Sequence, residues 1–420
     1  MLFITAAAAA ALAAGCSNSG GGGGGKSPST PVAWRDVPAV RLSYRYEADV
    51  PPPQIEPRTA EDRNSAVSAD FDNGRTLEIL DRTITSPNKK AVLAVYHRAG
   101  DKESEFRLDM YTPDGKLLRK VSSDAMAIHF PDTITWSPDS SAVAFVAMTR
   151  AGIPDGGIVP AAGAAPPDAA DGTDAAPQAA PTPAAPTGIL TFRSEQIYIA
   201  NADGQGVKPL TQNEGLIYFH YVWSPDSSML AALAMTVREW DLYDGIAATK
   251  GEFWYPAGRL RVVEKNGRER RLDDNVTVVR PVFSPDSTKV AIAFDTQVRI
   301  YDVVGTAPTQ ASAPLRNQLL LSSQAYDNEK KRELESGSSN ADTGSSPSPT
   351  PAPAAATLPD ERTLVSFNPI VEVAWQQDDL IYLMTAYVKR MKNDADSVTS
   401  YARWHRLVLT PQASGPEKQN

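Results

Sequence analysis

The sequence predicts an all-β fold, a β-propeller of five or six four-stranded blades. One turn motif returns four to five times along the 420-residue chain, and a second turn signal follows it in three places. Two turn signals in each repeat imply about four strands, which make one propeller blade. The spacing of the repeats agrees with this count once two low-complexity segments are set aside.

The first motif is a Ser-Pro-Asp turn that joins a short strand to an apolar strand. Proline presets the φ angle of a turn and aspartate bonds the backbone that follows, so repetition once per blade indicates turn capping rather than a catalytic Ser/Asp pair. The following strands AVAFVAM, KVAIAF and DLIYLM are almost continuously apolar, as in strands buried on both faces. The copies are Ser86-Pro87-Asn88, Ser137-Pro138-Asp139, Ser224-Pro225-Asp226, Ser284-Pro285-Asp286 and a degenerate one at 375–379.

The second signal is a hairpin dipeptide between strand-like runs. Asp-Gly and Asn-Gly favour the two-residue turns that join neighbouring antiparallel strands. We therefore expect one hairpin at each of three positions. These are Asp114-Gly115, Asp203-Gly204 and Asn266-Gly267.

The spacing of the repeats is measured from the residue just before each turn. Two of the gaps are long because they contain the segments 151–188 and 333–358. Ala, Pro, Ser and Gly dominate both segments and offer little to bury, so we expect two disordered inserts. Successive marks at Thr85, Trp136, Trp223, Phe283 and Trp375 are ~51, ~87, ~60 and ~92 residues apart, against ~40 to 50 for known blades.

The start of the ring leaves two interpretations open. A sixth blade around Trp34 would continue the spacing towards the N-terminus, although the turn motif is missing there. Alternatively, residues 38–50 and 76–84 supply outer strands that close the ring on the C-terminal blade. Closure in some form is expected, because an open ring leaves unpaired strand edges.

The N-terminal residues 1–15 form an uncharged apolar run that ends at Cys16, the single cysteine, before a Gly/Ser-rich tether at 16–32. The run is too short to span a bilayer and has the form of a secretory signal peptide. Ala13-Ala14-Gly15-Cys16 resembles the lipobox of bacterial lipoproteins. That resemblance implies acyl chains on Cys16 that anchor the protein to a membrane of the cell envelope, the outer membrane facing the periplasm in a Gram-negative organism. The alternative is an Ala-rich helix at a frayed N-terminus.

The segments 197–204, 207–211 and 223–226 together resemble the TolB-type propeller repeat, a relative of the WD-repeat-like blades. The resemblance recurs from about residue 80 to about 410. It implies a propeller domain over 33–412, followed by a C-terminal tail at 413–420. Propellers host binding, scaffolding and several chemistries, so the resemblance indicates the fold and does not choose among functions.

The composition argues against several functions. A net charge of -9 disfavours a nucleic-acid partner, because such proteins neutralise phosphates with clustered Lys and Arg. The sequence contains no Gly-x-Ser-x-Gly elbow and no phosphate-binding glycine loop behind a strand. One cysteine and four scattered histidines give no metal-ligand spacing. We therefore predict no catalytic residues, no metal and no cofactor. The histidines are His97, His129, His220 and His405.

An irregular stretch in the third repeat, 237–256, holds two of the seven tryptophans. Trp, Tyr and Arg dominate binding hot spots, and loops are where partners dock on a rigid scaffold. The alternative is that these tryptophans only extend a β-hairpin and pack on a neighbouring blade. The candidate binding residues are Trp240, Tyr243, Trp254 and Tyr255.

These observations favour a non-catalytic protein- or peptide-binding or scaffolding module of the cell envelope. We expect a monomer whose partner is an envelope protein or peptide. Two alternatives stay open: a propeller enzyme, a hydrolase or lyase with carboxylates from several blades in its central channel, and a polysaccharide-binding module with aromatic platforms exposed on one face.

Overall fold

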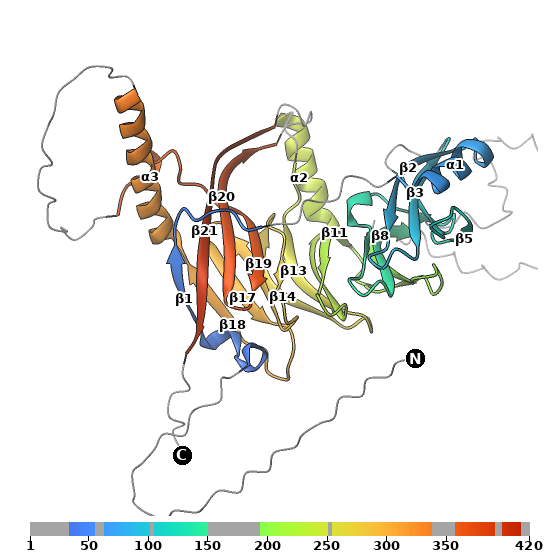
Figure 1. The fold of residues 1–420 in the computed structure, drawn as a ribbon, viewed down its shortest axis with the longest axis horizontal. Helices are drawn as coiled ribbons and strands as arrows, with labels where there is room; N and C mark the ends of the chain where they lie inside the picture. The colour runs from blue at the N-terminus through green and yellow to red at the C-terminus, as the bar shows by residue number, and fades with distance from the viewer. Residues whose placement is uncertain are drawn as a thin grey trace, which may run out of the picture.

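The computed structural model describes residues 33–54, 63–100, 105–149, 194–250, 254–337, 358–390 and 397–412. These residues form five antiparallel sheets that follow one another in chain order. Figure 1 shows them as a row, with β2, β3 and β5 at one end and β21 at the other. The predicted signal peptide, Cys16, the tether, the insert 151–188 and the C-terminal tail lie outside the described residues.

The first three sheets are meanders along the chain. The second has five strands, because both β6 and β7 pair with β8. The first sheet contains β2 (Glu78–Thr85), β3 (Val92–Arg98), β4 (Arg107–Tyr111) and β5 (Leu117–Lys120); the second β6 (Met126–Ala127), β7 (Thr135–Trp136), β8 (Ala142–Thr149), β9 (Gln196–Asn201) and β10 (Lys208–Pro209); the third β11 (Leu216–Trp223), β12 (Met229–Thr236), β13 (Gly258–Glu264) and β14 (Glu269–Thr277).

The last two sheets are four-stranded, and the fifth takes its outer strand from the N-terminal part of the chain. Strand β1 pairs with β21 from Leu42 opposite Pro411 to Glu47 opposite Arg406, and Figure 1 shows the two side by side. The fourth sheet contains β15 (Val282–Phe283), β16 (Lys289–Phe294), β17 (Gln297–Asp302) and β18 (Gln310–Pro314); the fifth β19 (Ile370–Gln377), β20 (Leu380–Lys389), β21 (Val398–Pro411) and β1 (Leu42–Glu47).

The start of the chain therefore differs in part from the sequence-based expectation. The segment 38–50 does supply an outer strand to the C-terminal sheet. The segment 76–84 does not, because β2 is the first strand of its own sheet. Trp34 lies in a short 3-10 helix, Trp34–Asp36, which belongs to none of the five sheets of the described residues.

Consecutive sheets share hydrophobic cores, and the second strand of a sheet contributes to two of them. In β8, Val143 and Phe145 pack towards the first sheet, whereas Ala144 and Val146 pack towards the third. Successive side chains of a strand point to opposite faces, so a strand between two sheets is apolar at every position. The expectation of burial on both faces is thus confirmed for β8, and β16 is equally buried over its first five residues.

For β20 the same expectation is wrong. Ile381 and Leu383 are buried in the core shared with the fourth sheet, but Tyr382 and Met384 on the other face are only half-buried. The fifth sheet stands at the end of the row, so it has a sheet neighbour on one face only (Figure 1).

At the other end of the row, a helix covers the outer face of the first sheet. Helix α1 (Ser65–Gly74) buries Val67 and Phe71 against β3 and β4. The Arg75 guanidinium that follows the helix lies 4.2 Å from the Phe71 ring centroid and 4.5 Å from that of Tyr96. None of the core clusters of the described residues joins the first sheet to the fifth.

The Ser-Pro-Asp turns cap themselves as predicted. Ser224 Oγ donates to Asp226 Oδ1 at 2.6 Å and accepts from the Met229 amide at 3.1 Å. The fourth residue of each turn, such as Ser227 with φ 61°, has left-handed backbone geometry. In the second, third and fourth turns this residue is a serine whose hydroxyl accepts a hydrogen bond from the preceding sheet. These links between neighbouring sheets are Asn88 N to Ser140 Oγ, Asp139 N to Ser227 Oγ and Asp226 N to Ser287 Oγ, each 3.0 Å.

The hairpin dipeptides also form turns. Gly115, Gly204 and Gly267 have φ angles of 87°, 78° and 90°, which glycine adopts at little cost. A Cβ atom at Gly115 would lie 2.7 Å from the Ala66 carbonyl oxygen, so this glycine also lets α1 approach the hairpin.

Two long helices interrupt the sheets. Helix α2 (Val237–Lys250) lies between β12 and β13, and helix α3 (Arg316–Gly337) follows β18. The prediction of a disordered insert at 333–358 is wrong for 333–337, because these residues continue α3, whose Leu319 and Leu320 are buried. Residues 338–357 lie outside the described part of the chain. Within the described residues, no helix is both long and apolar enough to cross a membrane.

Candidate functional site

A pocket of about 420 Å³ lies beside α2. Its wall comes from residues 129–133 before β7, from Phe219 and His220 in β11, and from Val278 and Arg280 before β15. The remaining wall comes from α2 and the segment that leads into β13. The pocket thus lies among the segments before β7 and β15 and the middle of β11, whereas the Ser-Pro-Asp turns follow the ends of these three strands.

Three wall residues occupy the same position of the repeat. Thr133, His220 and Arg280 each lie four residues before the first serine of their turn. This position reaches the pocket from the 3-10 helix before β7, from β11 and from the segment before β15, so the residue found there changes the pocket and leaves the turn intact. Aligning the repeats would have drawn attention to these residues in the sequence.

One end of the pocket is an aromatic cluster. The Trp240 and Trp254 ring centroids are 4.6 Å apart at an interplanar angle of 87°. Phe130 and Phe219 approach Trp240 from the sheets, with centroid distances of 5.6 and 6.0 Å. Tyr243 stacks on Trp254 at 6.3 Å and 17°. Such offset and edge contacts are those that aromatic rings prefer.

The sheet side of this cluster depends on a β-bulge. The pairing of β11 with β12 shifts between Tyr218 and His220, which leaves Phe219 as the extra residue. Bulges redirect side chains, and this one turns Phe219 towards Trp240. Opposite it, a Cβ atom on Gly258 would lie 2.7 Å from Phe219 Cζ and 2.9 Å from the Ala234 nitrogen, so only glycine leaves room for the ring.

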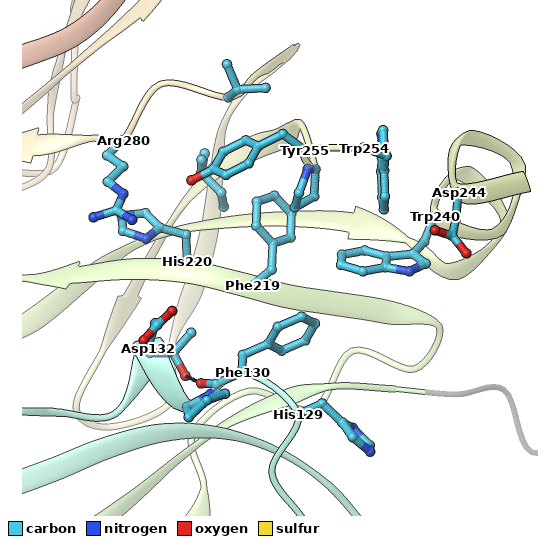
Figure 2. A pocket seen from close by; sticks show the side chains of 15 residues that line it. His129, Phe130, Asp132, Phe219, His220, Trp240, Asp244, Trp254, Tyr255 and Arg280 are labelled. Atoms are coloured by element: carbon cyan, nitrogen blue, oxygen red, sulfur yellow. Dashed lines mark hydrogen bonds between the residues drawn. The ribbon is translucent and has the colours of Figure 1, made fainter. Parts of the chain in front are cut away.

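Phe130 is positioned by the short helix that follows it, Pro131–Thr133. The Thr133 hydroxyl donates to the Phe130 carbonyl oxygen at 2.7 Å, and the Thr133 amide donates to the same oxygen at 3.0 Å. Figure 2 shows this hydrogen bond and the Phe130 ring turned towards Trp240.

Helix α2 begins with a capping box. The Glu239 amide donates to Thr236 Oγ1 at 3.2 Å, and the Thr236 amide donates to Glu239 Oε2 at 3.0 Å. Arg259 in β13 donates two hydrogen bonds to the Glu239 carboxylate, at 2.8 and 2.9 Å. These bonds from Arg259 lower the pKa of Glu239 to about 2, against the opposing effect of burial. The base of the helix that carries Trp240 is thereby fixed to the third sheet.

The other end of the pocket is polar. Figure 2 shows the Tyr255 hydroxyl, the His220 imidazole and the Arg280 guanidinium on one side, away from the two tryptophans. Arg280 is exposed and makes no hydrogen bond, ion pair or ring contact with another described residue. Asp132 lies on the same side, but its carboxylate accepts a hydrogen bond from Arg82 at 3.0 Å.

The four histidines have separate surroundings. His129 lies 2.7 Å from the buried carboxylate of Glu195, and His129 and His220 both line the pocket. His405 is buried in the fifth sheet between the hydroxyls of Tyr46 and Thr385, at 2.8 and 3.0 Å, and burial lowers its pKa to about 4. In the part of the chain that the structure describes, no group of three or more His, Cys, Asp or Glu side chains is placed to hold a metal ion.

The structure brings the predicted binding residues together. Trp240, Tyr243 and Trp254 form one aromatic cluster, and Tyr255 lines the same pocket. The expected extension of a β-hairpin is wrong, because 237–250 forms a helix whose N-terminal capping box is visible in the sequence as Thr236-x-x-Glu239. Sequence reasoning missed the wall residues contributed by the sheets, namely Phe130, Phe219, His220 and Arg280.

The described residues define a mostly β protein of successive antiparallel sheets, with an aromatic, ligand-sized hollow beside α2. No family model and no curated protein matches the chain. Similar solved structures include an oligogalacturonate lyase from Vibrio parahaemolyticus, at 12% identity and a TM-score of 0.29, over 55% of this chain and 52% of that one. This chain thus spans about half the length of the lyase.

Two further structures are similar at the same level. Prolyl oligopeptidase B from Galerina marginata has 10% identity and a TM-score of 0.39, over 79% of this chain and 36% of that one. A TolB-like protein from Agrobacterium tumefaciens has 14% identity and a TM-score of 0.25, over 56% and 67% of the two chains. Likenesses of this size indicate nothing about the function of this chain.

Proposed function

We propose that this protein is a non-catalytic binding module that holds a peptide, or a peptide segment of a partner protein, in the pocket beside α2. The observation that carries the proposal is the aromatic cluster of Phe130, Phe219, Trp240, Tyr243 and Trp254 at one end of a hollow of about 420 Å³. Pockets of this size lined by aromatic side chains suit one or a few bulky apolar groups.

The ring geometry favours an apolar side chain over a sugar. A sugar stacks on an open, flat aromatic face, whereas Trp240 meets Trp254 edge to face and Tyr243 stacks on Trp254. Phe130 and Phe219 contact Trp240 as well, at interplanar angles of 62° and 56°. The tilted rings therefore form a concave apolar surface, which suits the end of an apolar side chain better than the flat face of a sugar ring.

The test compares the cluster with a tryptophan elsewhere. Peptides selected from a random library on the full-length protein should bind Trp240→Ala/Trp254→Ala at least about 30-fold more weakly, the effect of losing a binding hot spot. The matched control is Trp404→Ala, because Trp404 is also half-buried but lies in the fifth sheet. Equal affinities for all three proteins would contradict the proposal.

The proposal extends to the cellular setting. The five sheets serve as the blades of a monomeric, TolB-like propeller scaffold, and acyl chains on Cys16 hold it at a membrane of the cell envelope, where an envelope protein or peptide is the partner. The support is the sequence alone: the lipobox-like Ala13-Ala14-Gly15-Cys16 and the Gly/Ser-rich tether. Cys16→Ser should move the protein from the membrane to the soluble fraction, and continued membrane association without detergent would contradict the anchor.

A further inference from the structure

We propose that the polar end of the pocket is a carboxylate subsite, so that the peptide carries a carboxylate beside a bulky apolar side chain. The inference rests on the proposed function and narrows its ligand class. Arg280, with the Tyr255 hydroxyl and His220 beside it, receives the carboxylate, while the aromatic cluster receives the side chain (Figure 2).

The first argument is that Arg280, an arginine of the pocket wall, has no carboxylate partner among the described residues. Arg82 donates to Asp132 at 3.0 Å, and Arg259 holds Glu239 with two bonds. Arg299 likewise forms an ion pair with Asp273, at 2.5 Å. Arg280 alone of these four has no such partner among the described residues. Its guanidinium is therefore available for a ligand at the pocket wall.

The second argument concerns the charges that face Arg280. Asp132 is the carboxylate on the same side of the pocket, and Arg82 already binds it. The other carboxylate of the wall, Asp244 of α2, lies beside Trp240 at the opposite end (Figure 2). A ligand carboxylate would thus meet a cation whose charge the pocket wall leaves unpaired.

The third argument is the match of donors and acceptors. A guanidinium offers parallel N–H donors that fit the two oxygens of a carboxylate, and a tyrosine hydroxyl adds another donor. The Tyr255 hydroxyl has no hydrogen-bond partner among the described residues, and Arg390 lies over its ring at 5.5 Å from the centroid. The polar end therefore offers donors to an acceptor group, and the aromatic end excludes water from the neighbouring side chain.

The experiment uses probes that differ only in the carboxylate. Calorimetry on the full-length protein compares N-acetyl-L-phenylalanine with its amide. The free carboxylate should bind about tenfold more tightly, as expected for a hydrogen-bonded charge pair. Acetyl-Phe-Asp-amide and acetyl-Phe-Asn-amide form a second pair, which shows whether a side-chain carboxylate is accepted as well as a C-terminal one. A preference in either pair supports the subsite.

The variants assign that preference to residues. Arg280→Gln should reduce the ratio between the affinities for carboxylate and amide to about one, with Arg280→Lys in between. Asp244→Asn is the matched control, because it removes a charge from the other end of the same pocket and should not lower the ratio. Arg280 makes no hydrogen bond or ion pair with another described residue, so an unchanged melting temperature checks that these variants fold.

Two results would overturn the subsite, namely equal affinities for carboxylate and amide in the wild type, or a preference that survives in Arg280→Gln. If the amide still binds and Trp240→Ala weakens it, the peptide-binding function stands and only the carboxylate subsite fails. If D-glucuronate binds more tightly than every phenylalanine probe, the peptide class itself is wrong.

Discussion

The strands that lead into the Ser-Pro-Asp turns, β7, β11 and β15, differ at their two ends, the far end at the turn and the near end at the pocket. At the far ends, the Ser-Pro-Asp turns repeat the same residues and the same hydrogen bonds in successive sheets, as with Ser137, Ser224 and Ser284. At the near ends, one repeat position carries a different residue in each sheet, Thr133, His220 or Arg280, and the pocket forms there.

This difference separates the residues that hold the sheets together, which lie in the turns, from the residues that shape the pocket, which vary between repeats. The turns form hydrogen bonds within and between sheets, so changing a turn residue should affect stability. The near ends border a hollow, so their residues are free to vary and to meet a ligand. Substitutions in the turns should therefore change stability, and substitutions at the pocket end should change binding. Only a residue that supports both the sheet and the pocket should change stability and binding together.

The largest effect is expected at a buried turn serine. Ser224 is fully buried, and its hydroxyl accepts from the amides of Met229 and Ser228 at 3.1 Å each. Ser224→Ala leaves the Met229 amide without its acceptor and removes the bond to Asp226 Oδ1, whereas the Ser228 amide keeps its own bond to Asp226. The free energy of unfolding should fall by about 2 to 3 kcal/mol. Urea unfolding measures the loss, and Ser284→Ala should behave alike because Ser284 Oγ also accepts from the amide of Lys289, at 2.9 Å, and donates to Asp286 Oδ1, at 2.6 Å.

The matched control is Ser228→Ala, for which a loss of about 0.5 kcal/mol is expected. Asp226 Oδ1 then keeps its bonds from the Ser224 hydroxyl and the Ser228 amide. Equal losses for Ser224 and Ser228 would contradict the assignment of stability to the buried hydroxyl.

Gly258→Ala should change stability and binding together. The new methyl group would lie 2.7 Å from Phe219 Cζ and 2.9 Å from the Ala234 nitrogen, and one of these must move. We expect a loss of about 1 to 2 kcal/mol from overpacking, with a weaker affinity for aromatic peptides. Melting temperature and calorimetry measure the two effects. Gly245→Ala in α2 is the control, since nothing lies within 4 Å of its added Cβ atom.

The sequence predicts the regular part of the fold well, because each strand and turn there is set locally. Apolar runs and Ser-Pro-Asp turns return in register, so one correctly interpreted repeat predicts the others. The β11 bulge is different. It places Phe219 through a one-residue shift in pairing, for which the local sequence carries no signal.

The candidate site is predictable only in part for the same reason. Trp240, Tyr243, Trp254 and Tyr255 stand out as an irregular aromatic stretch, whereas Arg280 belongs to a sheet ~40 residues later and reaches the pocket only through the packing of successive sheets. Helix α2 did have a local signal in its capping box. The low share of buried residues in the helix, Val237 and Ala247, explains why hydrophobic periodicity gave no sign of it.

The ion pair of Glu239 with Arg259, at the start of α2, should make the stability of the protein depend on pH. Its folded pKa of about 2 lies below the usual value near 4.5, so its stabilising contribution is present above pH 4.5 and is lost as the pH falls towards 2. Solvent screening of a partly exposed pair reduces this contribution to about 1 kcal/mol. Glu239→Gln should therefore be less stable than wild type by about that amount at pH 7 and equal to it near pH 2, as measured by urea unfolding. A gap independent of pH would contradict the role of the Arg259 ion pair.

The smallest change in stability is expected at Ser227, where two substitutions separate the effect of its hydrogen bond from that of its left-handed backbone. Ser227 accepts a hydrogen bond from Asp139 of the preceding sheet and has a φ angle of 61°. Ser227→Ala loses the bond and keeps the left-handed geometry, so we expect a loss of about 1 kcal/mol. Ser227→Gly loses the same bond but relieves the unfavourable backbone, so its unfolding free energy should lie within about 0.5 kcal/mol of wild type. If urea unfolding shows glycine to be the more destabilising of the two, then the left-handed geometry costs little here and the link between the sheets has the greater weight.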